Sequence, residues 1–327
     1  MTRVTLQHIA EHVGVSKYAV SRSLSGKDGV SERTRKTVER AAVELGYIGP
    51  VHMHSARSIQ LVLHDHDPVN SEVQLRIQRG IQREANRAGH PIQMQWAHEA
   101  NRLSEIIRTS AGMGMILVGP HPAIDPDTVR GPLPPIVKVA SVDLLEPVDQ
   151  VSSASNEATA ALGVRLVQRG HRNIAYLQGN GGLRGRTERY HAMVAAIGSH
   201  PGVTLDELHF KEDGGFLSAF EDLRARGRKP TVLVAGNDWI AVSIISDLLR
   251  IGLRVPEDIS VVGYGDYAAA TQITPQLTTI RVPGEEMGIA ALQMLMENMH
   301  RPRQQSNAYK RLLICPQIIE RQSLRPV

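Results

Sequence analysis

The sequence predicts an α/β protein with a small three-helix head, which contains a helix-turn-helix, followed by two doubly wound parallel sheets. Three observations support this fold class. Residues 5–24 have the spacing of two short helices joined by a tight turn, short apolar segments alternate with amphipathic ones from residue 59 onward, and positive charge is concentrated near the start. Strands that alternate with helices are typical of parallel sheets whose faces the helices cover.

The helix-turn-helix prediction rests on residues 5–24. An apolar stripe at helical spacing runs along the first helix, and Gly14 permits the positive φ that a tight turn needs. Thr5 and Ser16 stand where helix N-cap oxygens are required, and Val20 is placed to pack the second helix onto the first. In such a unit the second helix enters the major groove of DNA. An ordinary helical hairpin is the alternative.

A third helix is predicted from Ser31, its N-cap, to about Leu45, and Gly46 closes it. Gly49-Pro50 then breaks the chain, and residues 51–58 form a polar linker. The first 50 residues hold eight basic and five acidic residues, so they carry three of the four excess positive charges of the whole chain. This uneven charge is typical of a domain that binds phosphates.

Beyond the linker the apolar pattern predicts strands and helices in alternation. Strands are predicted at 59–63, 92–96, 115–118, 136–140, 173–177, 231–235 and 259–262. Helices are predicted at 73–88, 102–109, 157–169, 186–197, 216–226, 239–251 and 285–299. The number of strands suits two sheets.

Composition narrows the class of protein further. Hydrophobic residues make up 42% of the 327 residues, which is enough for one small and one or two larger domains. The single cysteine, Cys315, excludes an internal disulfide framework and fits a reducing cytosol. We find no apolar run of membrane-spanning length and no signal-peptide pattern, so we expect a soluble cytoplasmic protein that binds no membrane.

Several motifs resemble the lactose-repressor/galactose-repressor (LacI/GalR) family of transcription regulators. In the head these are 4–10, Gly14-Val15-Ser16, Val20-Ser21-Arg22, Val30-Ser31, Thr34-Arg35 and Leu45-Gly46-Tyr47. In the remainder they are His171-Arg172-Asn173-Ile174-Ala175, Ala235-Gly236-Asn237-Asp238, 255–264 and 275–280. The resemblance extends over nearly the full chain, and these blocks are specific in combination.

The resemblance implies a periplasmic-binding-protein-like architecture, in which two similar subdomains are joined by three crossovers and enclose a ligand cleft. It implies a head at 1–48, a linker at 49–58 and an effector-binding and dimerisation domain at 59–327. Within that domain we expect one subdomain at about 59–155 with 285–305, and a second at 156–283 with 306–327.

The family pattern also assigns candidate DNA contacts. Lys17, Tyr18 and Arg22 occupy positions that reach base edges, and the Arg22 guanidinium can donate two hydrogen bonds to guanine. The alternatives are a phosphate contact for Arg22 and a packing role for Tyr18. Phosphate contacts, which set register without reading sequence, are expected from Ser16, Ser21, Ser31 and Thr34.

Four residues are candidates for binding a small-molecule effector. Arg189 matches a family arginine that binds ligand oxygens, and Asn237 matches a ligand contact at a strand end. Lys211 falls near another pocket position and would favour an anionic effector, and Asn156 lies in an altered acid-amide pair. A surface charge for Arg189 and a turn cap for Asn237 are the alternatives.

Three departures from the family pattern bear on function. Sugar-responsive members commonly have two acids after the Gly-Tyr pair, whereas Tyr264 is followed by Gly265-Asp266. Ser155-Asn156 replaces an acid-amide pair, and both changes favour a different ligand, or none. The short linker lacks the leucine that inserts into the minor groove, and Met53 is the local substitute. We therefore expect little operator bending and a steep salt dependence.

Taken together, these features predict a nucleoid-associated transcription regulator, most simply a repressor, that responds to an effector such as a sugar or related metabolite. We expect a homodimer on a pseudo-palindromic double-stranded operator. The alternatives are a ligand-independent or protein-partnered regulator and, from another class, an enzyme with a fused DNA-binding head. No catalytic set, cofactor motif or metal site is evident, because His64-Asp-His-Asp67 and His52-Met-His54 lack a third ligand.

Overall fold

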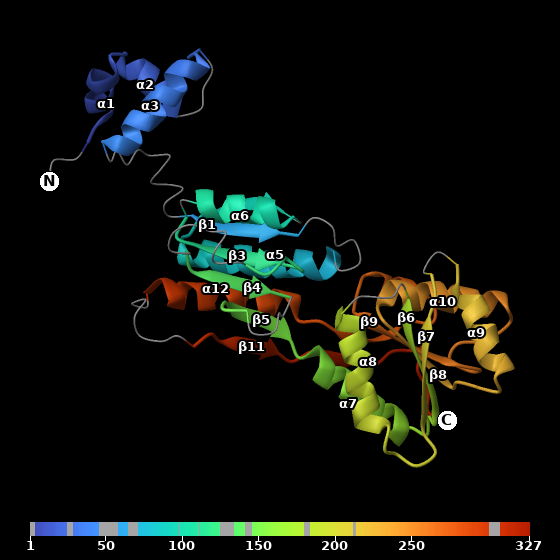
Figure 1. Ribbon diagram of the computed structural model, residues 1–327. Helices are drawn as coiled ribbons and strands as arrows, with labels where there is room; N and C mark the ends of the chain where they lie inside the picture. Colours follow the sequence, from blue (N-terminus) through green and yellow to red (C-terminus); the bar gives the residue numbers. More distant parts are fainter. Residues whose placement is uncertain are drawn as a thin grey trace.

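The computed structural model of the protein describes residues 4–24, 29–45, 58–64, 71–97, 99–110, 112–124, 134–140, 146–179, 184–211, 214–300 and 308–327. A three-helix head lies at one end of the molecule (Figure 1). Its helices are α1 (Leu6–Val13), α2 (Lys17–Leu24) and α3 (Glu32–Glu44). The predicted linker, apart from Ser58, lies outside the described residues.

Local signals explain the helix ends of the head. The Thr5 hydroxyl accepts a hydrogen bond from the His8 N–H at 3.4 Å and caps α1. Gly14 ends α1 in the left-handed region at φ 73°, as the turn requires. Ile9, Val20 and Val38, one from each helix, are completely buried against one another. The head therefore has a small apolar core of its own.

The first subdomain is built on a six-stranded sheet with the order β11-β5-β4-β3-β1-β2, in which all pairs are parallel. The strands are β1 (Ile59–Leu63), β2 (Ile92–Trp96), β3 (Gly114–Val118), β4 (Ile136–Val139), β5 (Asp149–Ser153) and β11 (Arg311–Ile314). One face packs against α5 (Ser71–Ala88) and α12 (Gly284–His300), and the other against α6 (Ala100–Thr109).

The second subdomain repeats this plan with the order β12-β10-β9-β8-β6-β7. Its strands are β6 (Asn173–Gly179), β7 (Thr204–His209), β8 (Val232–Ala235), β9 (Ser260–Gly265), β10 (Thr278–Arg281) and β12 (Gln317–Ile319). All pairs are parallel except β10 with β12. Helices α7 (Ser155–Gln168) and α8 (Arg184–Ile197) cover one face, and α9 (Phe216–Ala225) and α10 (Asp238–Arg250) the other. A short α11 (Ala269–Gln272) follows β9.

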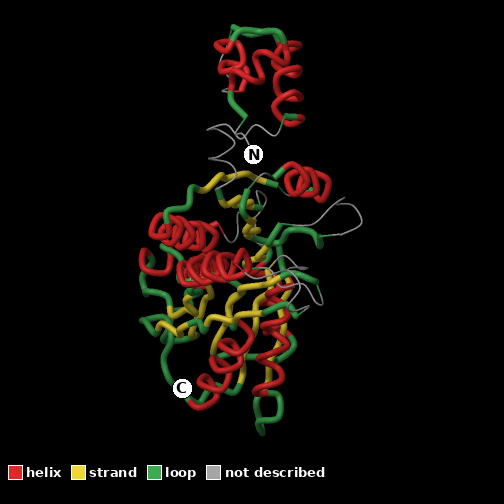
Figure 2. The backbone as a smooth tube through the Cα atoms, turned by 90° about the vertical axis from the view of Figure 1, so that its left-hand side faces the viewer, coloured by secondary structure: helices red, strands yellow, loops and turns green. Residues whose placement is uncertain are grey.

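The chain passes between the subdomains three times, after β5, after β10 and after β11. Figure 2 shows the two layered units following one another below the head. This arrangement agrees with the predicted fold class. One boundary differs, because the expectation assigned 306–327 to the second subdomain, whereas β11 joins the first sheet beside β5. The β11 side chains are largely exposed, so no buried apolar pattern marks which sheet the strand belongs to.

Helices α5 and α12 approach each other unusually closely. A Cβ atom added at Gly80 would lie 2.0 Å from the Glu285 carbonyl oxygen, and one at Gly288 would lie 2.1 Å from the Ile77 carbonyl oxygen. Only glycine fits at these two positions, so the pair of helices is held by backbone contact as well as by side chains. Helix α5 also carries Glu72 and Arg76, two side chains through which the first subdomain contacts the second.

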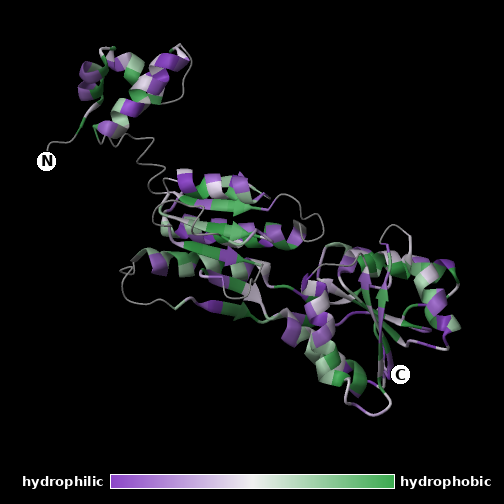
Figure 3. Ribbon diagram, viewed as in Figure 1, coloured by the Kyte–Doolittle hydropathy of each residue, from purple (hydrophilic) through white to green (hydrophobic). Residues whose placement is uncertain are grey.

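The predicted strands and long helices are present with small shifts of their ends, whereas five strands escaped prediction: β5, β7, β10, β11 and β12. Figure 3 shows hydrophobic residues along the central strands and a mixture of hydrophilic and hydrophobic residues along the helices. No helix within the described parts of the chain is long and apolar enough to span a membrane.

Candidate functional site

The exposed face of α2 presents the predicted base-contacting residues together. Lys17 and Tyr18 are exposed, and Tyr18 has 68% of its surface accessible. Arg22, one turn later, donates a hydrogen bond from Nη1 to the Tyr18 hydroxyl at 2.7 Å, and its Cζ lies 5.4 Å from the Tyr18 ring centroid. The two side chains therefore form one unit at the surface, so Tyr18 holds Arg22 rather than packing into the head's core.

The predicted phosphate-contacting hydroxyls lie at helix starts or on the α2 surface. Ser16 Oγ accepts a hydrogen bond from the Ala19 N–H at 3.1 Å, and Ser31 Oγ accepts one from the Thr34 N–H at 3.1 Å. Ser21 is exposed on α2. A capping hydroxyl keeps its own proton available, so Ser16 can cap its helix and still donate to a phosphate. Helix starts are also where phosphates bind favourably.

Arg189, on the first half of α8, is 6% exposed and sits at the carboxyl ends of the strands in the second sheet. Its Nε donates to the Gly185 carbonyl at 3.0 Å, and its Nη2 donates to the Gly236 carbonyl at 2.9 Å. The guanidinium lies over the ring of Tyr264, with Cζ 3.4 Å from the centroid. Nη1 is buried and has no hydrogen-bond partner among the described residues.

Tyr264 connects this arginine to the first crossover. The Tyr264 hydroxyl lies 2.5 Å from Ser155 Oγ, which is 2.6 Å from Ser153 Oγ at the end of β5. Tyr264 also packs against the apolar cores of both subdomains. We call Ser153, Ser155, Arg189, Gly236 and Tyr264 the Arg189 cluster. It lies at carboxyl strand ends of both sheets, where open α/β sheets bind ligands.

The other three candidate effector residues differ in their relation to the Arg189 cluster. Asn237 follows Gly236 directly, is 3% exposed, and accepts the Ile240 N–H at 2.8 Å as the N-cap of α10. Asn156 is exposed and follows Ser155 in the first turn of α7. Lys211 is exposed in the segment between β7 and α9, and no described contact brings it to Arg189. Asn237 and Asn156 thus follow residues of the Arg189 cluster directly in the chain, and the Asn237 side chain has the capping role given above as its alternative.

Two side chains of α5, Arg76 and Glu72, join the subdomains through three hydrogen bonds. Arg76 Nη1 donates to the Gly265 carbonyl at 3.1 Å, and Arg76 Nη2 donates to the Asp266 carbonyl. Glu72 accepts the Ala268 N–H at 2.9 Å. A cavity of about 410 Å³ lies here, lined by both subdomains. The segment after β9 is therefore held by the first subdomain, although it belongs to the second.

The carboxylate of Asp266 is bound by two arginines of its own chain. Arg281 Nε and Arg321 Nη2 donate to it at 2.7 and 2.6 Å. Burial alone would raise the pKa of Asp266, but the hydrogen bonds from these arginines lower that pKa below its usual value. Asp266 is thus ionised and neutralised within the protein.

Asp238, the first residue of α10, binds the segment that follows β9 through its carboxylate. It is completely buried, and its carboxylate accepts hydrogen bonds from Thr279 Oγ1 at 2.5 Å and the Tyr267 N–H at 2.6 Å. Burial raises the pKa of Asp238 to about 6. A Cβ atom added at Gly263 would lie 2.1 Å from this carboxylate, so glycine makes room for it.

We expect the contribution of Asp238 to stability to depend on pH. An acid whose pKa is higher in the folded than in the unfolded state stabilises the fold in its protonated form. For Asp238 this stabilisation is complete below the unfolded pKa of 3.8 and is lost as the pH rises through the folded pKa of about 6. Asp238→Asn should remove this dependence, since Thr279 can accept a hydrogen bond from the amide. Urea unfolding of both proteins at pH 4.5 and pH 7 measures the difference. An equal pH dependence in the two proteins would contradict the assignment.

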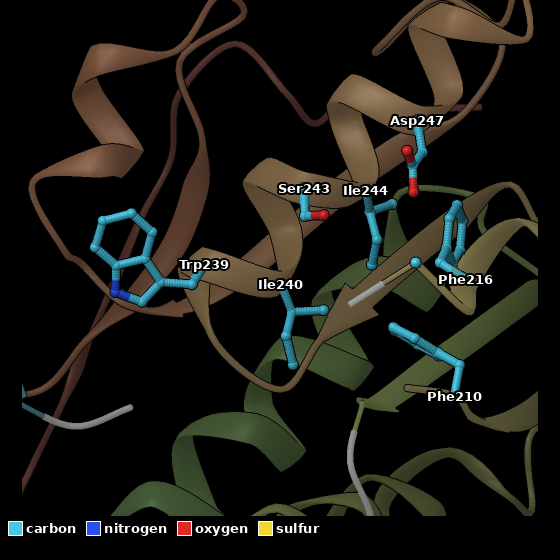
Figure 4. Close-up of a pocket in the computed structure, with 8 residues that line it drawn as sticks. Phe210, Phe216, Trp239, Ile240, Ser243, Ile244 and Asp247 are labelled. Atoms are coloured by element: carbon cyan, nitrogen blue, oxygen red, sulfur yellow. The ribbon is translucent and has the colours of Figure 1, made fainter. Parts of the chain in front are cut away.

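Near the α10 N-terminus a smaller cavity of about 140 Å³ lies between α9 and α10. Figure 4 shows Phe210 and Phe216 against Ile240 and Ile244, with Trp239 on the outer side. Trp239 is 50% exposed. This pocket shares the start of α10 with Asn237, and Lys211 directly follows Phe210 in the chain. Its lining is mainly apolar.

Arg186 was not singled out from the sequence. It is 3% exposed, its Nη1 donates to the Gln178 carbonyl at 2.7 Å, and its stem packs over Gly236. The available signal was its position three residues before Arg189, which puts both on one helix face.

Among the described residues no three side chains are grouped as metal ligands, and His64 packs edge-on against His121.

Comparison with known proteins agrees with this arrangement. Residues 5–49 match the family described as bacterial regulatory proteins, lacI family, and residues 164–324 match a periplasmic binding protein-like domain. The HTH-type transcriptional repressor CytR of Escherichia coli strain K12 is 29% identical over 97% of this chain and 96% of its own. The ribose operon repressor of the same strain is 28% identical over 98% of this chain and 99% of its own.

Solved structures give the same fold. A transcriptional regulator CelR–cellobiose complex has a TM-score of 0.67 at 25% identity, covering 98% of this chain and all of the other. A lac repressor dimer bound to operator and an anti-inducer has a TM-score of 0.64 at 23% identity, covering 98% and 99%. With a helix-turn-helix head, two parallel-sheet subdomains and full-length repressor homologues, the chain belongs to the LacI family of bacterial regulatory proteins and is a DNA-binding transcription regulator rather than an enzyme.

Proposed function

We propose that the protein is a cytoplasmic repressor that binds a specific operator through α2. Its operator affinity falls or rises when a small molecule binds at the Arg189 cluster. The observation that carries the effector part is Nη1 of Arg189, which is buried at the carboxyl strand ends and has no hydrogen-bond partner within the described part of the chain. A buried polar group without a partner is costly, and a ligand oxygen would satisfy it.

In this proposal, two copies bind a pseudo-palindromic operator, one head per half-site. Support for a homodimer comes from exposed apolar side chains on α5 and on the edge strand β2. Leu75, Met94 and Trp96 are 45%, 37% and 52% exposed. A second copy would cover this surface, since symmetric dimers pair the same patch on both subunits. Sedimentation of the full chain measures the assembly state.

The proposed coupling runs through the segment after β9. Tyr264 of that strand lies under Arg189, and the next residues are bound by Arg76 of the first subdomain. A ligand that binds one relative position of the subdomains more tightly shifts the population toward it. The positions of the two heads would follow, because each head is joined to a first subdomain.

The effector site is tested with Arg189→Ala and Asn237→Ser. Serine retains an N-cap oxygen for α10 but removes the amide, so the helix is preserved while the ligand contact is lost. We expect both variants to show a smaller change in operator affinity on adding effector, relative to their own effector-free affinity. Candidate effectors are the substrates and products of the enzymes that are encoded by genes beside the operator. Calorimetry with unchanged ligand affinity in both variants would contradict the site.

A further inference from the structure

Among the described residues, the contacts of Arg189 do not balance its positive charge. Its two hydrogen-bonded partners, the carbonyl oxygens of Gly185 and Gly236, are neutral, and the third contact is the face of the Tyr264 ring. Carbonyls and aromatic faces stabilise a cation, but they do not neutralise it. With 6% exposure this guanidinium has lost most of its water, and buried charges in proteins are normally paired.

The carboxylates near the strand ends are engaged elsewhere. Asp266 is bound by Arg281 and Arg321, and Asp238 by Thr279 and the Tyr267 backbone. Glu207, on the edge strand β7, accepts a hydrogen bond from Gln178 at 2.7 Å. Gly265, which follows Tyr264, and Ser155, the first residue of α7, carry no charge. Among the described contacts, no acid therefore pairs with Arg189.

A second feature beside Tyr264 also favours an anion. The N-cap of α7 is Ala154, whose side chain cannot accept a hydrogen bond from the first turn. The start of this 14-residue helix carries a partial positive charge. Ser155, its first residue, contacts the hydroxyl of the same tyrosine that lies under Arg189. The one acid of the first turn, Glu157, is exposed.

We propose that the effector carries an anionic group, a carboxylate or a phosphate, that binds the Nη1 edge of Arg189 beside the first turn of α7. This inference rests on the proposed effector site and adds the chemical class of its ligand. Arginine donates to carboxylate and phosphate oxygens in charge-assisted bonds, and helix N-termini bind the same groups. Arg186, buried one turn earlier on α8, adds a second positive charge to the region.

The test measures the thermal midpoint of the full-length protein with sodium phosphate, sodium acetate or glucose, each against sodium chloride at matched ionic strength. Binding to the folded state raises the midpoint in a saturable manner. We expect a rise with at least one of the two anions and none with glucose. A response to phosphate alone identifies a phosphoryl group, and a response to acetate alone a carboxylate.

Three variants locate the response. Arg189→Gln should weaken binding of the anion to which the wild type responds, so that its half-saturating concentration rises at least tenfold. Ser155→Asp should do the same by repulsion, although an acid at a helix start favours folding, so this variant remains informative if the first does not fold. Arg184→Gln, on the exposed side of α8 beside Glu188, is the matched control and should respond as the wild type does.

The inference is overturned if neither anion acts beyond chloride, or if all three variants respond equally. An increase of the thermal midpoint with glucose that depends on Arg189 would also overturn the anionic class of the ligand. Such a result would leave the proposed effector site intact. Loss of the proposed function would appear differently, as a protein whose operator affinity no small molecule changes.

Discussion

Arg22→Ala is expected to remove most of the protein's preference for its operator over unrelated DNA. Arg22 is half-buried on α2, and Tyr18 holds its guanidinium at the exposed surface of the helix. A two-point arginine contact to guanine discriminates against other bases by about 1–3 kcal/mol. That corresponds to about a 5- to 150-fold loss of the specificity ratio.

The measurement is operator affinity divided by affinity for non-specific DNA, at one salt concentration, for wild type and variant. Lys36→Ala is the matched control, because Lys36 is an exposed cation on α3 that forms an ion pair with Glu32 at 4.0 Å. Lys36→Ala should lower the affinity for operator and for non-specific DNA to a similar extent, so the ratio of the two should not change. If Arg22→Ala keeps the full ratio, Arg22 contacts phosphate and does not read bases.

Gly80→Ala is expected to cause the largest loss of stability from a single methyl group. The added carbon would lie 2.0 Å from the Glu285 carbonyl oxygen, so α5 and α12 must move apart. Overpacking of this kind costs about 1–3 kcal/mol, and here the obstacle is backbone, so we expect about 3 kcal/mol. Because α5 also carries Arg76, the contact to the second subdomain should weaken as well.

Gly185→Ala provides the control for this prediction. Gly185 lies within α8, and a Cβ atom there would meet nothing within 4 Å. The same substitution should therefore be neutral or stabilise by about 0.5–1 kcal/mol through helix propensity. Urea unfolding measures both variants. Equal stability of the two would show that the α5–α12 contact adapts without cost.

The sequence was sufficient for the head and for the central strands. Ile9, Val20 and the caps at Thr5 and Ser16 act locally, so short-range patterns predict them. The strands that were missed lie at sheet edges or bear polar residues. β7 has one buried residue, Leu208, and β10 buries Thr278 and Thr279 through hydrogen bonds rather than apolar packing.

The effector region was predictable only in part. The resemblance pointed to Arg189 and Asn237, but the stacking of Arg189 on Tyr264 joins α8 to β9 through two residues that are 75 positions apart in the chain. Such contacts depend on sheet order, which periodicity does not give. Lys211 was placed from a segment without firm motifs, and the structure leaves it exposed and apart from the Arg189 cluster.

Selection of binding sites from genomic DNA with the purified full-length protein shows whether this chain is an operator-specific regulator. We expect enrichment of one pseudo-palindromic sequence whose two half-sites are contacted by two copies of α2. Enrichment that is independent of sequence, and that falls with salt at every site alike, would contradict it.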